Sequence, residues 1–185
     1  FTISTANYLA QAKVAGLSLL THNPDYYFTI YLADKINGRF NVDEFLPIQV
    51  VEVESLGIEQ FEEMLQRYNA FELSNALKPF VAEYIFNQNK DVDSVAYIDS
   101  DIMVYAPFAE IGGLLVSHNI IITPHLQSPL PLDGFLLDEQ SFLNAGIYNG
   151  GFFIVKRGAE SFRFLKWWMK RLRTDCIVNF HKGLF

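Results

Sequence analysis

Short β-branched and apolar runs alternate with longer segments of helical periodicity, and this alternation constrains the fold more than any other feature of the sequence. The strand-like runs are rich in Val, Ile, Thr, Tyr and Phe and cover residues 1–5, 27–33, 48–53, 95–98, 119–123 and 152–155. The segments of helical spacing cover residues 6–20, 61–68, 71–86, 107–115 and 159–173. Strands that alternate with helices predict an α/β domain, with a mostly parallel sheet covered by helices on both sides.

An aspartate pair stands at the end of the buried strand predicted for residues 95–98. Asp99 and Asp101 are two residues apart, so in extended backbone their side chains point to the same side. Unpaired carboxylates are costly to bury, and hard oxygen ligands suit Mg²⁺ or Mn²⁺. Ligands of open α/β sheets bind at the carboxyl ends of the strands. The pair therefore predicts a divalent-metal site; the simpler alternative is that Asp99 caps a turn and Asp101 is solvated.

Length and composition bound the class of protein. A chain of 185 residues is by default one domain. Half of its residues are hydrophobic and 15% are aromatic, which is enough for a large core. The formal net charge of −7 argues against a nucleic-acid partner, because such proteins present a basic face. An anionic ligand would therefore need a cation or locally placed basic residues.

The remaining composition bears on the compartment and the limits of the chain. Cys176 is the single cysteine, so no intrachain disulfide forms and a reducing, cytoplasmic compartment fits. No apolar run approaches the roughly 18 residues of a membrane span, and no signal-peptide pattern opens the chain. The sequence starts inside a predicted strand and stops at the apolar pair Leu184-Phe185. We expect a single domain over residues 1–185 that is cut at both ends.

Pro79, which follows Lys78, interrupts the predicted helix 71–86. The proline predicts either that the helix proper starts near Lys78 or that it kinks there. A lysine near a helix N-terminus opposes the helix dipole, which hints at an anionic partner. A solvated surface lysine is the equal alternative.

Two glycines precede the strand predicted for residues 152–155. Gly150 and Gly151 follow Asn149, and a Gly-Gly pair before a buried strand indicates positive φ or a close backbone approach. A β-bulge is the alternative to a bound ligand. His125 lies in the proline-rich segment 124–134, which we expect to be an ordered loop, and a single histidine there is more often a structural hydrogen-bonding group than a ligand.

The last predicted helix, 159–173, is amphipathic. Its apolar side carries Phe162, Leu165, Trp168, Met169 and Leu172, and its basic side carries Lys166, Lys170, Arg171 and Arg173. Such a basic side is usually solvated, although it could also rest on an anionic membrane surface.

Four segments together resemble the nucleotide-sugar glycosyltransferases of the GT-A fold, most closely glycosyltransferase family 8. They are residues 2–8 with the later His22-Asn23-Pro24, residues 74–80 around Lys78, Asp99-Ser100-Asp101, and Tyr148-Asn149-Gly150-Gly151. Their order and approximate spacing match over nearly the whole chain. The resemblance implies a GT-A, Rossmann-like α/β domain.

The resemblance also implies roles for individual residues. Asp99 and Asp101 would bind Mn²⁺ or Mg²⁺, and the substrate-binding residues would be Thr5, Asn7, Tyr8, Lys78, Ser100, Asn149 and Gly150. Thr5 and Ala6 stand where the family usually carries aspartates, and Lys78 stands where it often carries arginine. The third metal ligand and the donor-sugar residues of the family would lie beyond Phe185.

The implied activity is that of a hexosyltransferase-type glycosyltransferase. It would move a sugar from a nucleotide diphosphate sugar, with UDP-sugar favoured, to a saccharide or glycoconjugate acceptor, with retention of anomeric configuration by analogy. No residue declares itself as a nucleophile, and this fragment by itself could be inactive. A cytoplasmic location at the inner face of the membrane would suit such a protein.

Three other classes are weighed against this one. A nucleotidyltransferase of related fold prefers a Gly-rich first loop with a basic residue, which Ser4-Thr5-Ala6-Asn7 lacks. Haloacid-dehalogenase phosphatases need Thr or Val where Met103 stands. A non-catalytic nucleotide-sugar-binding relative stays open. Neither G-x-G-x-x-G nor a Walker A loop occurs, which disfavours dinucleotide and P-loop proteins.

Overall fold

The computed structural model describes residues 1–131, 133–134 and 138–179. The strands are β1 (Thr2–Ser4), β2 (Thr29–Leu32), β3 (Gln49–Glu52), β4 (Ser94–Ile98), β5 (Ile120–Pro124) and β6 (Tyr148–Lys156). The α-helices are α1 (Leu9–His22), α2 (Phe61–Arg67), α3 (Ala70–Gln88), α4 (Ala109–Leu114), α5 (Glu139–Ala145) and α6 (Ala159–Leu172). Short 3₁₀ turns cover Ala6–Tyr8, Val42–Phe45 and Val53–Leu56. Among the α-helices, α5 was not predicted from the sequence. Asp138 caps it by accepting a hydrogen bond from the Ser141 backbone N–H at 2.8 Å.

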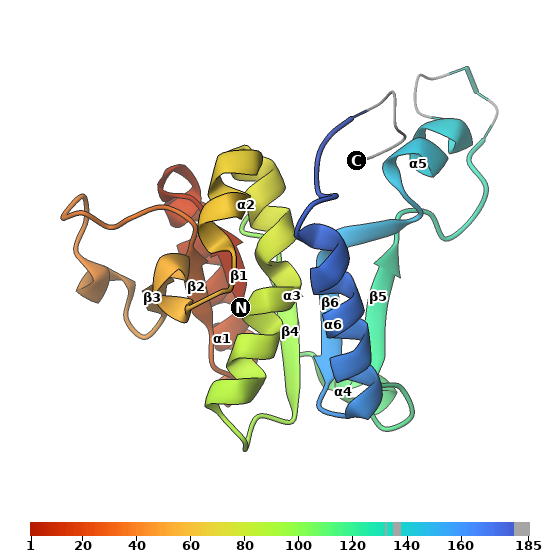
Figure 1. The fold of residues 1–185 in the computed structure, drawn as a ribbon. Coiled ribbons are helices and arrows are strands. Elements are labelled where there is room, and N and C mark those ends of the chain that lie inside the picture. Colours follow the sequence, from red (N-terminus) through yellow and green to blue (C-terminus); the bar gives the residue numbers. More distant parts are fainter. Residues whose placement is uncertain (132, 135–137, 180–185) are drawn as a thin grey trace.

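The strands form two three-stranded sheets that meet at β1 and β4. The first sheet is parallel in the order β1-β2-β3, and the second is antiparallel in the order β4-β6-β5. Two backbone hydrogen bonds join them, from the Phe1 nitrogen to the Ala96 carbonyl at 2.8 Å and from the Ile98 N–H to the Phe1 carbonyl at 3.1 Å. This is the pattern of a parallel pair, so the full order is β3-β2-β1-β4-β6-β5 (Figure 1).

The predicted α/β class is confirmed, but the mostly parallel sheet is wrong for the second half. There β6 runs antiparallel to both of its neighbours. An apolar run predicts a buried strand but not the direction of that strand. Antiparallel neighbours can also be connected without a crossover helix. As a consequence, the start of β6 lies beside the carboxyl end of β4, with Ile98 opposite Phe152.

Helices cover both faces of the sheet, as predicted. Tyr31 and Tyr97 point into a core built with α3 and α6, whereas Ile30 and Ile98 point into a second core built with α1. Neighbouring residues of one strand thus serve opposite faces, as the pleat requires. In Figure 1, α3 and α6 lie side by side in front of the sheet, and they pack against each other. No helix within the described ranges has the length and apolarity that crossing a membrane requires.

Helix α3 corrects the prediction that the helix starts near Lys78, whereas the alternative of a kink there stays a prediction. It begins at Ala70 behind a capping box, in which the Asn69 side chain accepts from the Glu72 N–H and the Glu72 carboxylate accepts from the Asn69 N–H, each at 2.9 Å. The helix then continues through Pro79 to Gln88. A proline inside a helix costs roughly 3 kcal/mol, which the buried side chains around Pro79 offset. Lys78 therefore lies in mid-helix, and the helix-dipole argument does not apply to it.

Candidate functional site

The candidate site is centred on Asp99, which directly follows β4. Its backbone N–H donates to the Gly151 carbonyl at 2.8 Å, which ties it to the start of β6. Its Oδ1 accepts a hydrogen bond from the Tyr97 hydroxyl at 2.5 Å and lies 3.4 Å from the Lys78 ammonium. The carboxylate is therefore held from two sides although 41% of its side chain remains exposed. Asp99 lies at the strand's carboxyl end, where the sequence predicted it.

Lys78 is a buried cation beneath this carboxylate. Only 4% of the residue is exposed, so the solvated-lysine alternative is wrong. Its Nζ donates to the Gly150 carbonyl at 2.9 Å and lies 4.4 Å from the centre of the Tyr97 ring. Burial lowers the pKa of Lys78, and the neighbouring Asp99 carboxylate partly opposes that change. Helix α3 thus delivers one desolvated positive charge to the edge of the sheet where β4 ends.

Tyr97 supports both charged groups from within the core. Its ring stacks on Phe153 with centroids 5.3 Å apart, and its hydroxyl is the donor to Asp99. Burial, followed by the Asp99 charge, raises the pKa of Tyr97 well above its ordinary value, so the hydroxyl stays protonated and donates. Tyr97 was not among the site residues predicted from the sequence. Its position two residues before Asp99 is the signal that was available, because alternate strand residues share a face.

The glycine pair approaches the site closely, but the constrained glycine is Gly151 rather than Gly150. A Cβ on Gly151 would lie 2.6 Å from Asp99 Oδ2 and 2.8 Å from Asn149 Oδ1. A Cβ on Gly150 would meet only Lys78 Nζ, at 3.6 Å, an ordinary contact. Neither of these two glycines has positive φ. A register shift between β5 and β6 falls opposite them, between Ile122 and Thr123, so the bulge and the close approach occur together.

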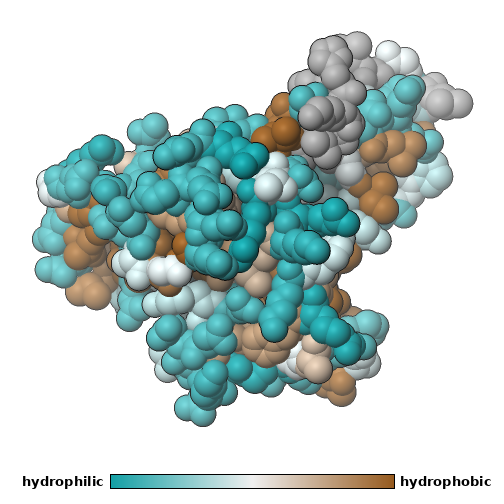
Figure 2. Space-filling view, in the orientation of Figure 1, coloured by the Kyte–Doolittle hydropathy of each residue, from teal (hydrophilic) through white to brown (hydrophobic). Residues whose placement is uncertain are grey.

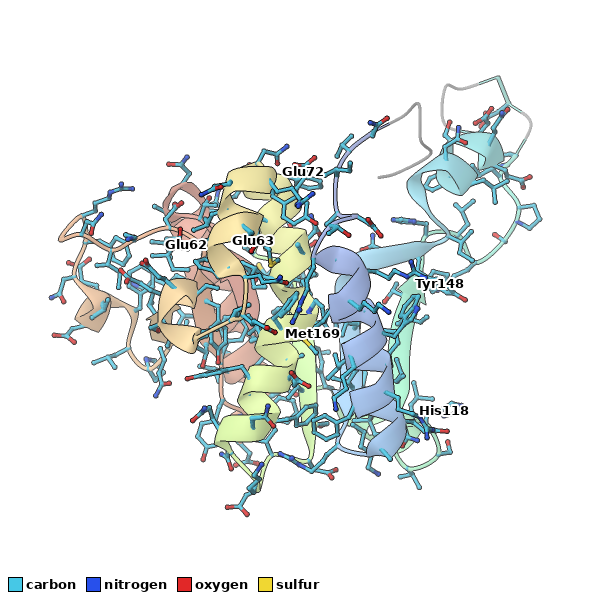
Figure 3. The ribbon with its side chains drawn as sticks, in the orientation of Figure 1. Glu62, Glu63, Glu72, His118, Tyr148 and Met169 are labelled. Atoms are coloured by element: carbon cyan, nitrogen blue, oxygen red, sulfur yellow. The ribbon has the colours of Figure 1, made fainter. Side chains whose placement is uncertain are left out.

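Asn149 belongs to the same cluster. Its Oδ1 accepts from the Gly151 N–H at 2.6 Å, which folds the side chain back on the strand beside Asp99. The neighbouring Tyr148 opens β6 (Figure 3). The structure therefore brings together four of the predicted residues: Lys78, Asp99, Asn149 and Gly150.

The predicted nucleoside loop lies at the same edge of the sheet. Thr5, Asn7 and Tyr8 follow β1, which is parallel to β2 and pairs with β4, so the carboxyl ends of all three strands meet there. Thr5 is half-buried, and Asn7 and Tyr8 are exposed. The loop is anchored by Asp34, whose Oδ2 accepts from the Ala6 N–H at 2.6 Å. Direct contact between this loop and Asp99 stays a prediction.

Asp34 itself is a residue that sequence reasoning missed. It stands shortly after β2, as Asp99 stands after β4. The shared signal is a carboxylate that follows a buried strand. Because the Asp34 side chain contacts the backbone of Ala6 at the sheet edge, Asp34 is a second acidic group near the predicted nucleoside loop.

Ser100 and Asp101 form the turn after β4, in which the Ile102 N–H donates to the Asp99 carbonyl at 3.2 Å. Asp101 is exposed and Ser100 is half-buried. Within the described ranges, no three or more His, Cys, Asp or Glu side chains gather to hold a metal. The two carboxylates after β4 do not form a closed protein cage, and the binding of a metal ion by both of them stays a prediction.

His125 has the structural role expected from the sequence. Its Nδ1 lies 2.6 Å from the Gly146 carbonyl, its backbone N–H donates to the Ile147 carbonyl at 3.0 Å, and its ring packs near Phe142. These contacts tie the loop after β5 to the residues that precede β6.

Comparison with known proteins gives one curated relative and several solved structures. No protein-family model matches the chain. The relative is the "Uncharacterized protein YfnF" of Bacillus subtilis (strain 168), 23% identical over 131 residues, which cover 70% of this chain and 42% of that protein. The chain therefore spans less than half the length of the curated relative it matches.

The solved structures are glycosyltransferases at 15% identity. The galactosyltransferase LgtC in complex with donor and acceptor sugar analogues has a TM-score of 0.58, covering 98% of this chain and 68% of that one. An active-site mutant of LgtC has a TM-score of 0.53, covering 91% and 58%. Mouse xyloside xylosyltransferase 1 in its apo form has a TM-score of 0.51, covering 92% and 70%. At this identity the likeness shows the fold, and the chain has the GT-A fold of these enzymes.

Proposed function

We propose that this chain forms the donor-binding part of a glycosyltransferase that moves a sugar from a nucleotide diphosphate sugar, in first place a UDP-sugar, to a saccharide or glycoconjugate acceptor. The observation that carries the proposal is the buried Lys78 ammonium, set between Asp99 and the Gly150 carbonyl where β4 ends. The named fold neighbours, a galactosyltransferase and a xylosyltransferase, support this class. Membership of glycosyltransferase family 8 is part of the proposal and rests on the sequence resemblance.

The site resolves an electrostatic problem that the composition raises. A chain with a net charge of −7 repels a nucleotide diphosphate unless positive charge is placed locally. Lys78 supplies such a charge from a desolvated position, where electrostatic interactions are stronger than in water. Asp99 and Asp101 would hold Mn²⁺ or Mg²⁺. When bound, the ion supplies Lewis-acid stabilisation of negative charge on the diphosphate.

The chain's own residues organise the transfer. The bond between the anomeric carbon and the diphosphate oxygen breaks, a bond to an acceptor hydroxyl oxygen forms, and the hydroxyl proton leaves to solvent or a base. Lys78 stabilises the departing charge, Tyr97 orients Asp99, and the Asn149–Gly151 backbone borders the sugar. Thr5, Asn7, Tyr8 and Ser100 would contact the nucleotide. Retention of anomeric configuration completes the proposal and rests on the resemblance.

A thermal-shift experiment tests the nucleotide and metal part. A ligand at about 100 times its Kd stabilises a fold by about 2.7 kcal/mol, which for a chain of this size raises Tm by about 5–10 °C. We expect Mn²⁺ with UDP to give such a shift for the wild type and for Asp91→Asn, a control at an exposed turn carboxylate. Asp101→Asn should lose most of the shift. An equal shift in all three proteins would contradict the metal assignment.

Release of free nucleotide tests the transfer itself. We expect UDP to accumulate when the full-length protein is incubated with Mn²⁺ and a panel of UDP-sugars, measured by a coupled assay for the free nucleotide. Nucleotide-sugar binding without release of nucleotide would instead support a non-catalytic relative. In a parallel reaction with UTP and a sugar 1-phosphate in place of the UDP-sugar, release of pyrophosphate would support a nucleotidyltransferase.

A further inference from the structure

Helix α6 presents a narrow cationic face on an acidic protein. Arg163, Lys166, Trp167, Lys170 and Arg171 follow the spacing i, i+3, i+4, i+7, i+8, and all five are exposed. This spacing places them along one side of the helix, and we call them the α6 stripe. The stripe consists of four cations around one indole. Arg173, which the sequence placed on this basic side, instead pairs with Glu59 at 3.1 Å.

The opposite side of α6 fixes the orientation of the stripe. Ser161, Leu165 and Met169 are buried. Met169 lies on the side of α6 that faces α3 (Figure 3). Trp168 is turned inward, with its ring 5.1 Å from that of Phe153. The helix therefore cannot roll, and its cationic face stays toward the solvent.

The charge of the stripe contrasts with the rest of the chain. Taking its four positive charges away from the net charge of −7 leaves the remaining chain at −11. Within the described residues, the ion pair recorded for the stripe is that of Arg163 with Glu160, at 3.8 Å and between largely exposed groups. The surface around α6 in the view of Figure 2 is mostly hydrophilic. The stripe is thus a basic strip with little internal neutralisation.

Trp167 adds a second kind of contact. Trp167 is 56% exposed, although tryptophan is among the residues that usually bury the most apolar area. Phe164 lies against it with ring centroids 6.1 Å apart, which holds the indole at the helix surface. Tryptophan with one apolar and one hydrogen-bonding edge favours the boundary between water and lipid headgroups. Its position between Lys166 and Lys170 places it at the centre of the charged strip.

We propose that the α6 stripe docks the protein on a membrane surface rich in anionic lipids, with the helix parallel to the membrane and Trp167 at headgroup depth. The α6 stripe extends over residues 163–171, about 12 Å along the helix axis, and such a short straight strip suits a planar partner. Two cavities, one lined by Ile98, residues 102–111 and Phe152 and the other by residues 125–129, Glu139, Phe142, Leu143 and Ile147, include no residue of α6, so nothing there suggests a small ligand on the stripe. A polyanion longer than α6 would also meet the acidic remainder of the chain.

The contact is electrostatic with one aromatic anchor. Each basic residue near an anionic membrane contributes about 1 kcal/mol, which is roughly a fivefold change in the partition constant. The apolar face of α6 is part of the core and does not insert. The inference is independent of the proposed transfer activity, because it uses no residue of the candidate site.

Vesicle co-sedimentation tests the inference. The protein is mixed with vesicles of phosphatidylcholine containing 30% phosphatidylglycerol, or with pure phosphatidylcholine, at 0.1 M salt. We expect binding to the anionic vesicles only. Raising the salt to 0.5 M should release the protein, because the screening length falls from about 10 Å to about 4 Å. Equal binding to both vesicle types, or no binding to the anionic vesicles, overturns the proposal.

Matched variants separate the stripe from net charge. Gln at all four basic positions of the stripe should weaken binding about a hundredfold or more. The control removes the same charge elsewhere, at the exposed residues Lys35, Arg39, Arg67 and Lys90. It should bind nearly as the wild type does. The proposal is overturned if the two variants lose equal affinity for the vesicles. It is also overturned if sedimentation velocity shows stripe-dependent self-association without vesicle binding, or if the protein binds a single-stranded oligonucleotide equally tightly.

Tryptophan fluorescence gives an independent readout. The chain has two tryptophans, so Trp168→Phe leaves Trp167 as the single reporter. We expect a blue shift and protection from acrylamide when anionic vesicles are added. Unchanged emission of a vesicle-bound protein would show that the stripe is not the contacting surface.

Discussion

Alanine at Gly151 should destabilise the protein, whereas alanine at the adjacent Gly150 should not. A Cβ at Gly151 would lie 2.6 Å from Asp99 Oδ2 and 2.8 Å from Asn149 Oδ1. A Cβ at Gly150 would lie 3.6 Å from Lys78 Nζ, which is normal van der Waals contact. The pair is a matched comparison, because the two glycines are neighbours in one strand and both lack positive φ.

The expected cost follows from what would have to move. Asp99 can retreat only by loosening the hydrogen bond from Tyr97 at 2.5 Å or its contact with Lys78 at 3.4 Å. A hydrogen bond to a charged group contributes about 1.5–3 kcal/mol, and overpacking a well-packed site costs about 1–3 kcal/mol. We expect Gly151→Ala to lower the free energy of unfolding by about 2 kcal/mol, taken from these ranges. Gly150→Ala should change it by about 0.5 kcal/mol or less, or stabilise slightly through the unfolded state.

Urea unfolding followed by circular dichroism measures both values, with the slope m as a check on two-state behaviour. A double-mutant cycle assigns the cause. In an Asp99→Ala background the carboxylate clash is gone, so Gly151→Ala should cost less than in the wild type. The contact with Asn149 Oδ1 remains, so the rescue should be partial. If Gly151→Ala and Gly150→Ala have equal stability, or if the cycle shows no coupling, the described placement of Asp99 is wrong.

Three further predictions concern the groups around Asp99 and the single thiol. Lys78→Met keeps an apolar stem of similar length but removes the buried cation. The affinity for UDP with Mn²⁺, measured by calorimetry, should therefore fall tenfold or more, while the circular dichroism spectrum stays native. An unchanged affinity would show that Lys78 is not part of the site. Tyr97→Phe retains the ring but loses the hydroxyl donor to Asp99, so the Mn²⁺–UDP thermal shift should shrink, whereas the buried control Tyr31→Phe should keep it. Burial raises the pKa of Cys176 from 9.0 to about 11. Because the thiolate is the nucleophile, iodoacetamide at pH 8 should alkylate the native protein at least tenfold more slowly than the urea-unfolded protein. Equal rates of alkylation would contradict the burial of Cys176.

The sequence by itself determined most of the strands and helices, although not α5, and the location of the acidic group. Alternation of β-branched runs with helical stripes was sufficient for the α/β class, because period 2 and period 3.6 are local properties of the chain. Asp99 could be placed at a strand's end for a similar local reason, since a charge directly after an apolar run ends the buried stretch. The start of α3 was also locally encoded by Asn69 and Glu72, and the proline at position 79 drew the prediction away from it.

Only the tertiary structure decided how the residues of the candidate site come together. The direction of β6 depends on which strands it pairs with, and its antiparallel run is what sets Gly150 and Gly151 beside Asp99. The burial of Lys78 likewise depends on the packing of α3 against β4 and β6, which no local spacing records. That Gly151 rather than Gly150 admits no side chain follows from contacts across strands far apart in sequence. Residue spacing along one segment carries information about its own faces, whereas distances between segments are settled when the sheet and its covering helices pack together.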